Sequence, residues 1–247
     1  RTKDWEVRPA SLMKLIPIRL RRSRTLASHS SAALQHHFET AEQQKDASTI
    51  GMWVFLVTEI MFFGGLFLAY MVYRQAYPAA FAAASNKTDL WLGAANTTVL
   101  ICSSLTMALA VHYASLGKKN MIVLFLVATL ILGGTFLGVK GVEYHDKWVH
   151  HEIPGANFEC EGCADAQHAT LFFACYFGMT GLHATHMIVG AFILLYLILQ
   201  ARKGAYTSEW YTPVEMFGLY WHFVDIIWIF LFPLLYLIDR TGTGLKG

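Results

Sequence analysis

The chain alternates between long apolar stretches and short polar segments, and this alternation predicts its architecture. An α-helix rises about 1.5 Å per residue, so roughly 20 mainly apolar residues are needed to cross the hydrocarbon core of a bilayer. Five stretches meet this requirement, at about residues 50–73, 90–116, 120–142, 168–201 and 215–238. We therefore predict an all-α fold, a polytopic transmembrane bundle of five helices that forms one domain over residues 50–240.

The first 49 residues contain no comparable apolar stretch and form a polar N-terminal arm. Within the arm, Leu34, Phe38 and Ala41 recur at helical spacing, which predicts a short surface helix that leads into the first span. An anchor that lies on the lipid surface is the alternative. A second polar segment, about residues 143–165, is expected to form the loop between the third and fourth spans.

Composition and charge support a membrane protein and exclude several other classes. Hydrophobic residues make up 55% of the chain, charged residues 15%, and the mean hydropathy is +0.41, outside the usual range for a soluble domain. A net charge of +2 is too small to indicate a nucleic-acid partner. No phosphate-binding loop or nucleophile elbow occurs in the sequence. We expect the partners to be membrane proteins and lipid.

An odd number of spans places the two termini on opposite sides of the membrane. The densest basic cluster lies in the N-terminal arm, at Arg19, Arg21, Arg22 and Arg24. Cytoplasmic segments carry an excess of Lys and Arg. We predict a cytoplasmic N-terminus and a C-terminus on the outer face.

Glu59 is the only charged residue of the first span. A charged carboxylate near the centre of a membrane helix costs at least about 2.5 kcal/mol, so such a group is normally paired or protonated and is often functional. A neutral Glu that holds two helices together is the structural alternative. Phe55, Phe62 and Phe63 share its helical face, which predicts aromatic rings around the carboxyl.

The fourth span carries His183 and His186, three residues apart, within a polar stripe that also includes Tyr176 and Thr180. Imidazole binds haem and metal ions, so ligation is one interpretation. Two ligands of one b-type haem usually come from different helices, however, and this pair points in one direction. The pattern therefore favours interhelical hydrogen bonds, and we predict no metal site.

In the last span, His222 and Asp225 share one face, and Trp221 lies beside them. Asp225 is expected to accept a hydrogen bond from His222 or from an imidazole of the fourth span. Such a network serves either as a proton relay or as a pair that fixes helix register. Asn96 of the second span is predicted to hold helices together.

Cys160 and Cys163 have C-x-x-C spacing, but Ala164 stands where covalent haem attachment would need a His. A disulfide on the oxidising side is the first interpretation, and a metal site completed by nearby histidines is the second. Cys102 and Cys175 lie within spans and are expected to be buried thiols.

These motifs together resemble subunit III of haem-copper respiratory oxidases. The run YWHFVDIIWIFLF, from Tyr220 to Phe232, is similar to the terminal-helix signature of that family. TGLHATHMIVG (180–190) and TEIMFF (58–63) resemble two further family helices, and NTT (96–98), the Ser pair at 103–104 and EY (143–144) match as well. The resemblance covers about residues 51–236. The C-x-x-C segment departs from the family pattern.

The resemblance implies the five-helix bacterial form of an accessory subunit in a proton-pumping terminal oxidase, most simply a cytochrome c oxidase, with a quinol oxidase as the alternative. It implies no redox centre in this chain and no catalytic residue, with haem and copper held by partner subunits I and II. It also implies a lipid cleft that binds phospholipid, support of the catalytic subunit's stability and proton uptake, and an inner-membrane location, with a larger respiratory supercomplex as a further partner. Glu59 would be the buried membrane carboxyl, and an interhelical polar set would line the cleft: His183, His186, His222, Asp225, Asn96 and Trp221. A self-contained haem-binding oxidoreductase built on the histidines is the competing hypothesis.

Overall fold

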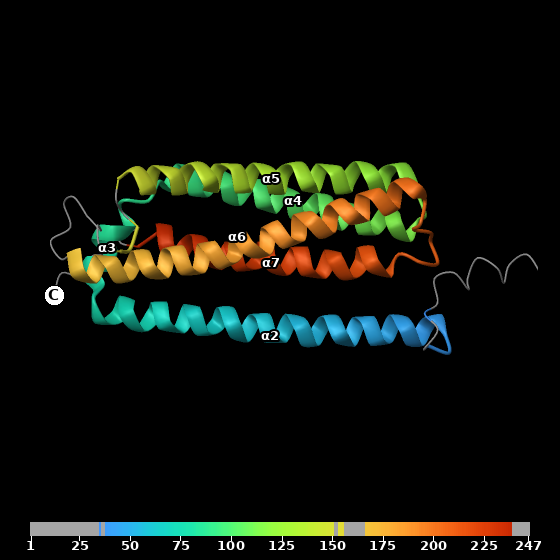
Figure 1. The fold of residues 1–247 in the computed structure, drawn as a ribbon, viewed down its shortest axis with the longest axis horizontal. Helices are drawn as coiled ribbons and strands as arrows, with labels where there is room; N and C mark the ends of the chain where they lie inside the picture. Colours follow the sequence, from blue (N-terminus) through green and yellow to red (C-terminus); the bar gives the residue numbers. More distant parts are fainter. Residues whose placement is uncertain (1–34, 36–37, 151–152, 156–165, 239–247) are drawn as a thin grey trace, which may run out of the picture.

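The computed structural model describes residues 35, 38–150, 153–155 and 166–238, and six helices occur in these ranges (Figure 1). The helices are α2 (Ala41–Ala76), α3 (Pro78–Ser85), α4 (Leu90–Ser115), α5 (Lys119–Val149), α6 (Ala166–Lys203) and α7 (Thr212–Tyr236). All except α3 are long and apolar enough to cross a membrane. The prediction of an all-α bundle with five spans is therefore confirmed.

The first span begins earlier than the hydropathy pattern predicts. Thr40 caps α2 by accepting a hydrogen bond from the Gln43 amide at 3.1 Å, and Glu42 stands in the first turn, where the helix dipole favours an acid. No Gly or Pro interrupts the segment from Ala41 to Ile50, so helix formation continues into the apolar stretch. The expectation of a separate surface helix is wrong for the residues from Ala41 onward, which are the first turns of α2 itself.

The third span also extends further than expected, because α5 continues to Val149. Residues 143–149, which the sequence suggested as loop, are helical. Lys140, just before this extension, shares one face of α5 with Glu143 and Lys147, and all three are buried against neighbouring helices. Polar residues here belong to the bundle interior, which hydropathy alone does not reveal.

The spans are arranged around a central pair of helices, α6 and α7 (Figure 1). The helices α4 and α5 pack extensively against each other on one side of this pair, and α2 lies alone on the other side. Of the five spans, α7 is the most buried and α2 the least. The apolar surface that α2 leaves uncovered is compatible with contact with lipid or with another membrane chain.

One end of α2 is held against the last turn of α7. The final carbonyls of a helix lack intrahelical partners, and in a membrane protein they need others. The Tyr70 hydroxyl donates to the Leu234 carbonyl, and the Ser85 hydroxyl of α3 donates to the Leu235 carbonyl at 2.8 Å. These two contacts fix α2 and α3 at this end of the bundle.

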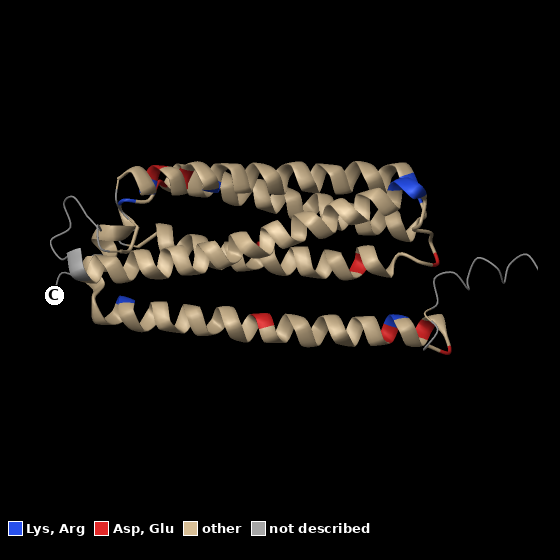
Figure 2. Ribbon diagram, in the orientation of Figure 1, with Lys and Arg blue, Asp and Glu red and all other residues tan. Residues whose placement is uncertain are grey.

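Most charged residues of the described helices lie toward the two ends of the bundle, with few between them (Figure 2). The described chain begins at one end of the bundle, and the last turn of α7 lies at the other (Figure 1). This arrangement is what an odd number of spans requires.

Candidate functional site

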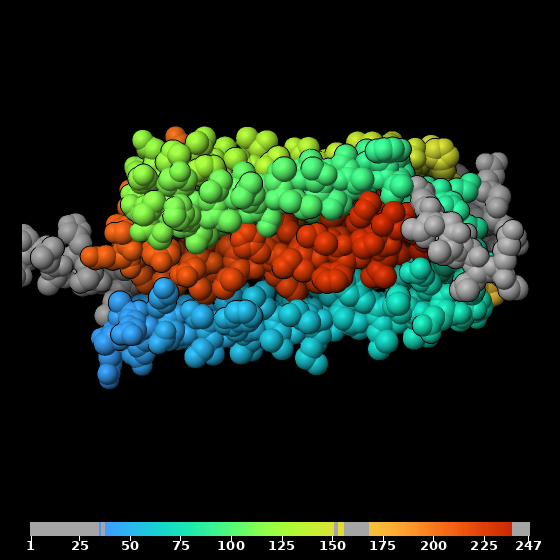
Figure 3. All heavy atoms as spheres, turned by 180° about the vertical axis from the view of Figure 1, so that it is seen from behind, coloured from blue at the N-terminus to red at the C-terminus, as the bar shows by residue number. Residues whose placement is uncertain are grey.

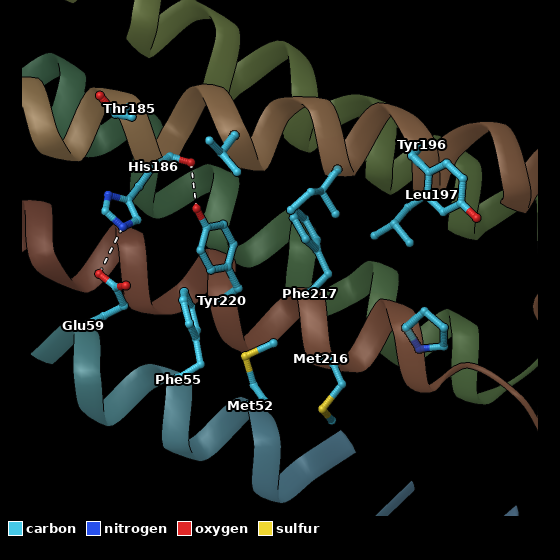
Figure 4. A pocket seen from close by; sticks show the side chains of 13 residues that line it. Met52, Phe55, Glu59, Thr185, His186, Tyr196, Leu197, Met216, Phe217 and Tyr220 are labelled. Atoms are coloured by element: carbon cyan, nitrogen blue, oxygen red, sulfur yellow. Dashed lines mark hydrogen bonds and ion pairs between the residues drawn. The ribbon is translucent and has the colours of Figure 1, made fainter. Parts of the chain in front are cut away.

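Glu59 of α2 and His186 of α6 meet between these two helices, with 3.1 Å between Glu59 Oε2 and His186 Nε2 (Figure 4). The second imidazole nitrogen, His186 Nδ1, lies 2.9 Å from the Leu182 carbonyl oxygen. A carbonyl only accepts, so Nδ1 carries a proton, and the contact with Glu59 holds a second proton on one partner or the other. The pair is neutral overall in both cases, which lowers the cost of placing it within the membrane.

Aromatic rings surround this pair, as the sequence suggested, with one exception. The Phe63 ring centroid lies 5.4 Å from that of His186, and the Phe55 ring lies 6.1 Å from that of Tyr220. Phe62 lies at the outside of this group: it is 53% exposed, and its ring centroid lies 6.3 Å from that of Phe63. The reason is that α2 contacts the bundle through a narrow stripe, and Phe62 lies at the edge of that stripe.

A pocket of about 650 Å³ opens between α2, α6 and α7, and Glu59 and His186 lie at one end of it (Figure 4). Its remaining wall is mainly apolar and aromatic, and includes Met52, Phe55, Met216 and Phe217. The Tyr220 hydroxyl, which also faces the pocket, is engaged by donating to the His186 carbonyl at 2.8 Å. The pocket is thus mainly apolar, with the Glu59–His186 pair at one end.

The expected polar stripe holds in part: Tyr176, Thr180 and His183 all meet side chains of α5, whereas His186 departs from it. His186 faces α2, whereas His183 is completely buried between the Phe136 and Trp228 rings, with centroid distances of 5.3 and 5.1 Å. Neither nitrogen of His183 has a hydrogen-bond partner in the described part of the chain. A separation of three residues turns a helix by about 300°, enough to direct the two rings into different interfaces when several helices pack around α6.

His222 and Asp225 do not form the expected hydrogen bond. His222 Nδ1 instead lies 2.7 Å from the Ser104 hydroxyl of α4. Asp225 is buried, and neither of its oxygens has a hydrogen-bond partner among the residues described. The two side chains share a helix face without bonding to each other, and both lie beside Ser104 of α4.

Trp221 and Asn96 both make contacts between helices. The Trp221 indole donates to the Ser103 hydroxyl at 2.9 Å, and Asn96 Nδ2 donates to the Phe136 carbonyl at 3.4 Å. The Trp221 ring also lies against Gly133 of α5, where a Cβ atom would approach it to 2.9 Å. A glycine is needed at that position because any side chain would collide with the indole.

The most elaborate polar cluster lies near one end of the bundle, and the sequence patterns did not predict it. Lys140 Nζ contacts Glu143 Oε2 at 2.9 Å, the Tyr176 hydroxyl at 3.0 Å and the Tyr236 hydroxyl at 2.9 Å. Both tyrosines donate to Glu143 Oε1, at 2.5 and 2.6 Å. Lys140 and Glu143 are only 4% and 7% exposed. The sequence feature that could have indicated this cluster is a Lys three residues before a Glu, a spacing that places both on one helix face.

Two predictions about cysteine have different outcomes. Cys160 and Cys163 lie outside the described residues, so the proposed disulfide stays a prediction. Within the described residues, Cys102 and Cys175 are free thiols, but Cys102 is exposed rather than buried, because its side of α4 faces away from the bundle. No group of three or more potential metal ligands occurs in the part of the chain that the structure describes.

Comparison with known proteins shows a consistent family. The family model described as "Cytochrome c oxidase subunit III" matches residues 6–239. Cytochrome c oxidase subunit 3 of Thermostichus vulcanus is 31% identical over 221 residues, which cover 87% of this chain and 98% of that protein. Quinol oxidase subunit 3 of Bacillus spizizenii is 29% identical over 214 residues (87% and 96%). Cytochrome bo(3) ubiquinol oxidase subunit 3 of Pseudomonas aeruginosa is 28% identical over 203 residues (82% and 90%).

Proposed function

Because the chain belongs to the cytochrome c oxidase subunit III family, we propose that it is the accessory subunit 3 of a proton-pumping haem-copper terminal oxidase of aerobic respiration. Its partners are the catalytic subunit I and subunit II, which hold the haem and copper. The chain itself contributes no redox centre and no catalytic residue. It binds phospholipid and supports the stability and proton uptake of its catalytic neighbour. Membership of a larger respiratory supercomplex belongs to the same proposal.

The arrangement of the imidazoles supports a subunit without its own haem. His186 uses both ring nitrogens in hydrogen bonds within the chain, and His183 is enclosed by two aromatic rings. His222 lies at a different interface, beside Ser104. The three rings therefore do not face a common space, and they do not fit the two opposed ligands that a b-type haem needs. This geometry argues against the alternative of a self-contained haem-binding oxidoreductase.

The observation that carries the lipid part of the proposal is the pocket beside Glu59. A mainly apolar pocket of about 650 Å³ that opens between membrane helices suits a fatty acyl chain, which gains hydrophobic contact with methionine and aromatic side chains. The Glu59–His186 pair, which is neutral overall and hydrogen-bonded within itself, would contact the bound molecule at one end of the pocket. Phospholipid is the occupant that a membrane supplies in excess.

The distribution of exposed basic residues supports an N-terminus on the cytoplasmic side of a bacterial inner membrane. Four basic residues at the end where α2 begins are exposed, namely Lys118, Lys119, Arg202 and Lys203. At the opposite end Lys87 is exposed and Arg74 is partly exposed, whereas Lys140 and Lys147 are buried within the bundle and add little to the surface charge. This difference in exposed positive charge supports a cytoplasmic position for the end where α2 begins.

A quinol oxidase is the second candidate complex, since two of the three relatives described above are named as its subunit 3. The electron donor binds elsewhere in such a complex, so this chain would act in the same way in both.

Purification through a tag on the N-terminal arm, in mild detergent, tests the proposal. The expected product is a complex that contains haem and copper, with oxidase activity, from which this chain separates without colour. The absorbance spectrum and metal content would be measured for the whole complex and for the separated chain. Haem retained by the separated chain, or isolation of the chain without any haem-copper partner, would contradict the proposal. Reduction of the complex by cytochrome c or by a quinol distinguishes the two donors.

A further inference from the structure

One side of α7 remains uncovered although α7 is the most buried span. Ile226, Ile229 and Phe230 are 49%, 44% and 57% exposed. They follow the partly exposed His222 at intervals of four, seven and eight residues, so they form one stripe along the helix. Seen from behind, this side of α7 lies open between α4 and α2 (Figure 3). On α4, Ile101 and Leu105 flank Ser104 and are also exposed. We name six of these residues the α4–α7 surface: Ile101, Leu105, His222, Ile226, Ile229 and Phe230.

His222 is the residue of this surface that lacks a hydrogen-bond partner for one of its ring nitrogens. Its Nδ1 is engaged with the Ser104 hydroxyl at 2.7 Å, but its other ring nitrogen, Nε2, makes no hydrogen bond within the described chain. The residue stands near the middle of α7, at the depth of the hydrocarbon core. An imidazole nitrogen without a partner at that depth carries a substantial desolvation penalty.

Three outward-facing hydroxyls of the spans do not share this need. The Thr135 hydroxyl of α5 donates to the Ile131 carbonyl at 2.9 Å, and the Thr185 hydroxyl of α6 donates to the Gly181 carbonyl at 2.9 Å. Thr98 of α4 donates to Ala94 in the same way, at 3.0 Å. These hydroxyls are satisfied by their own helices and are compatible with lipid.

Lipid cannot provide what His222 lacks. Acyl chains offer no hydrogen-bonding group, headgroups lie at the two faces of the bilayer, and the hydrocarbon core excludes water. A second transmembrane helix with a hydroxyl, amide or carboxyl side chain can provide it, while its apolar side chains cover the isoleucines. We propose that the α4–α7 surface is the docking site for a transmembrane helix of a partner oxidase subunit, which forms a hydrogen bond with His222 Nε2. This inference rests on the proposed function for the identity of the partner.

Two substitutions separate the outward contact from the contact with Ser104. The amide group of Asn lies where Nδ1 of an imidazole lies, whereas the longer Gln places its amide near Nε2. His222→Asn should therefore keep the contact with Ser104 and lose the partner, and His222→Gln should keep the partner. We expect the His222→Asn chain to dissociate from the complex about three- to tenfold faster in mild detergent, as one membrane-buried hydrogen bond predicts, and the His222→Gln chain to remain near the wild-type rate. Equal rates for both variants, whether unchanged or raised, would overturn the role of Nε2.

Photocrosslinking in the intact complex then locates the docking surface. A benzoylphenylalanine at Ile226 should crosslink to a haem- or copper-bearing subunit, identified by mass spectrometry, whereas the same group at the exposed Phe192 of α6 should not. Crosslinks from Phe192 alone, from neither position, or from Ile226 to lipid or a second copy of this chain would overturn the proposal. The wild-type chain is purified in parallel. Failure of that chain to bring down a haem-copper partner would contradict the proposed function instead.

Discussion

The buried Lys140–Glu143 pair makes a stability prediction whose size can be worked from its contacts. Replacing Lys140 with Met removes the cation but leaves Glu143, which is 7% exposed, with only the hydroxyls of Tyr176 and Tyr236. Removing one member of a buried ion pair typically destabilises a protein by about 3–5 kcal/mol, because the remaining charge lies unpaired in a low-dielectric interior. The two short tyrosine contacts persist, so we expect a loss near the lower limit, about 3 kcal/mol.

A second substitution should recover most of that loss. In the double variant Lys140→Met, Glu143→Gln, no buried charge remains, and the Gln carbonyl can still accept from a tyrosine hydroxyl. We expect the double variant to lie within about 1 kcal/mol of the wild type, since replacing both members of a buried pair is often close to neutral. Adding Glu143→Gln should therefore recover about 2 kcal/mol of the free energy of unfolding that Lys140→Met loses.

Reversible unfolding of the purified chain in mixed micelles, titrated with SDS and followed by far-UV circular dichroism, would measure these differences. Lys203→Met is the matched control, because Lys203 is exposed at the end of α6, and its loss should change the free energy of unfolding by less than about 0.5 kcal/mol. Two results would refute this prediction: a loss of unfolding free energy in Lys140→Met no larger than that of the control, or no gain of unfolding free energy when Glu143→Gln is added.

Three further predictions follow from single sites. Glu59→Gln should leave the chain-to-haem ratio of the purified complex unchanged, because a Gln amide can donate to the imidazole that faces it; loss of the chain would show that the carboxyl itself is required. Gly133→Ala should destabilise the chain by about 1–3 kcal/mol in SDS titrations, because the new Cβ would lie 2.9 Å from a buried indole, whereas Gly134→Ala, with nothing within 4 Å, should be neutral or slightly stabilising. Burial, together with a nearby tyrosine, raises the pKa of Tyr206, in the loop before α7, to about 12. The neutral Tyr206 side chain therefore contributes its full share of the free energy of unfolding below pH 10, and this share declines as the pH rises toward 12. Tyr206→Phe should flatten the dependence of stability on pH in this range, and an unchanged dependence would contradict the assignment.

The positions of the spans followed from the sequence, and their ends did not. Long apolar stretches can be counted without knowing what packs against them, because lipid replaces the protein interior as the apolar solvent. Whether a polar segment such as residues 143–149 continues a helix depends on partners from other helices. Lys140 and Glu143 find such partners in two tyrosines that stand far away in the sequence.

The directions of the polar side chains were likewise decided by the tertiary structure. Helical spacing correctly placed Glu59 on the face of α2 that meets the bundle, and it indicated that polar groups connect the helices. It wrongly joined His183 to His186 and His222 to Asp225, because sharing a sector of one helix does not determine which neighbour each residue meets.

By itself, the sequence determined the class of protein, the number of spans and the family resemblance, since these depend on composition and local order along the chain. Only the tertiary structure decided that Glu59 pairs with His186, that a lysine and a glutamate are buried together, and that His222 faces outward from α7. The physical reason is that a buried polar group is stable only beside its partner, and that partner is supplied by the packing of distant helices.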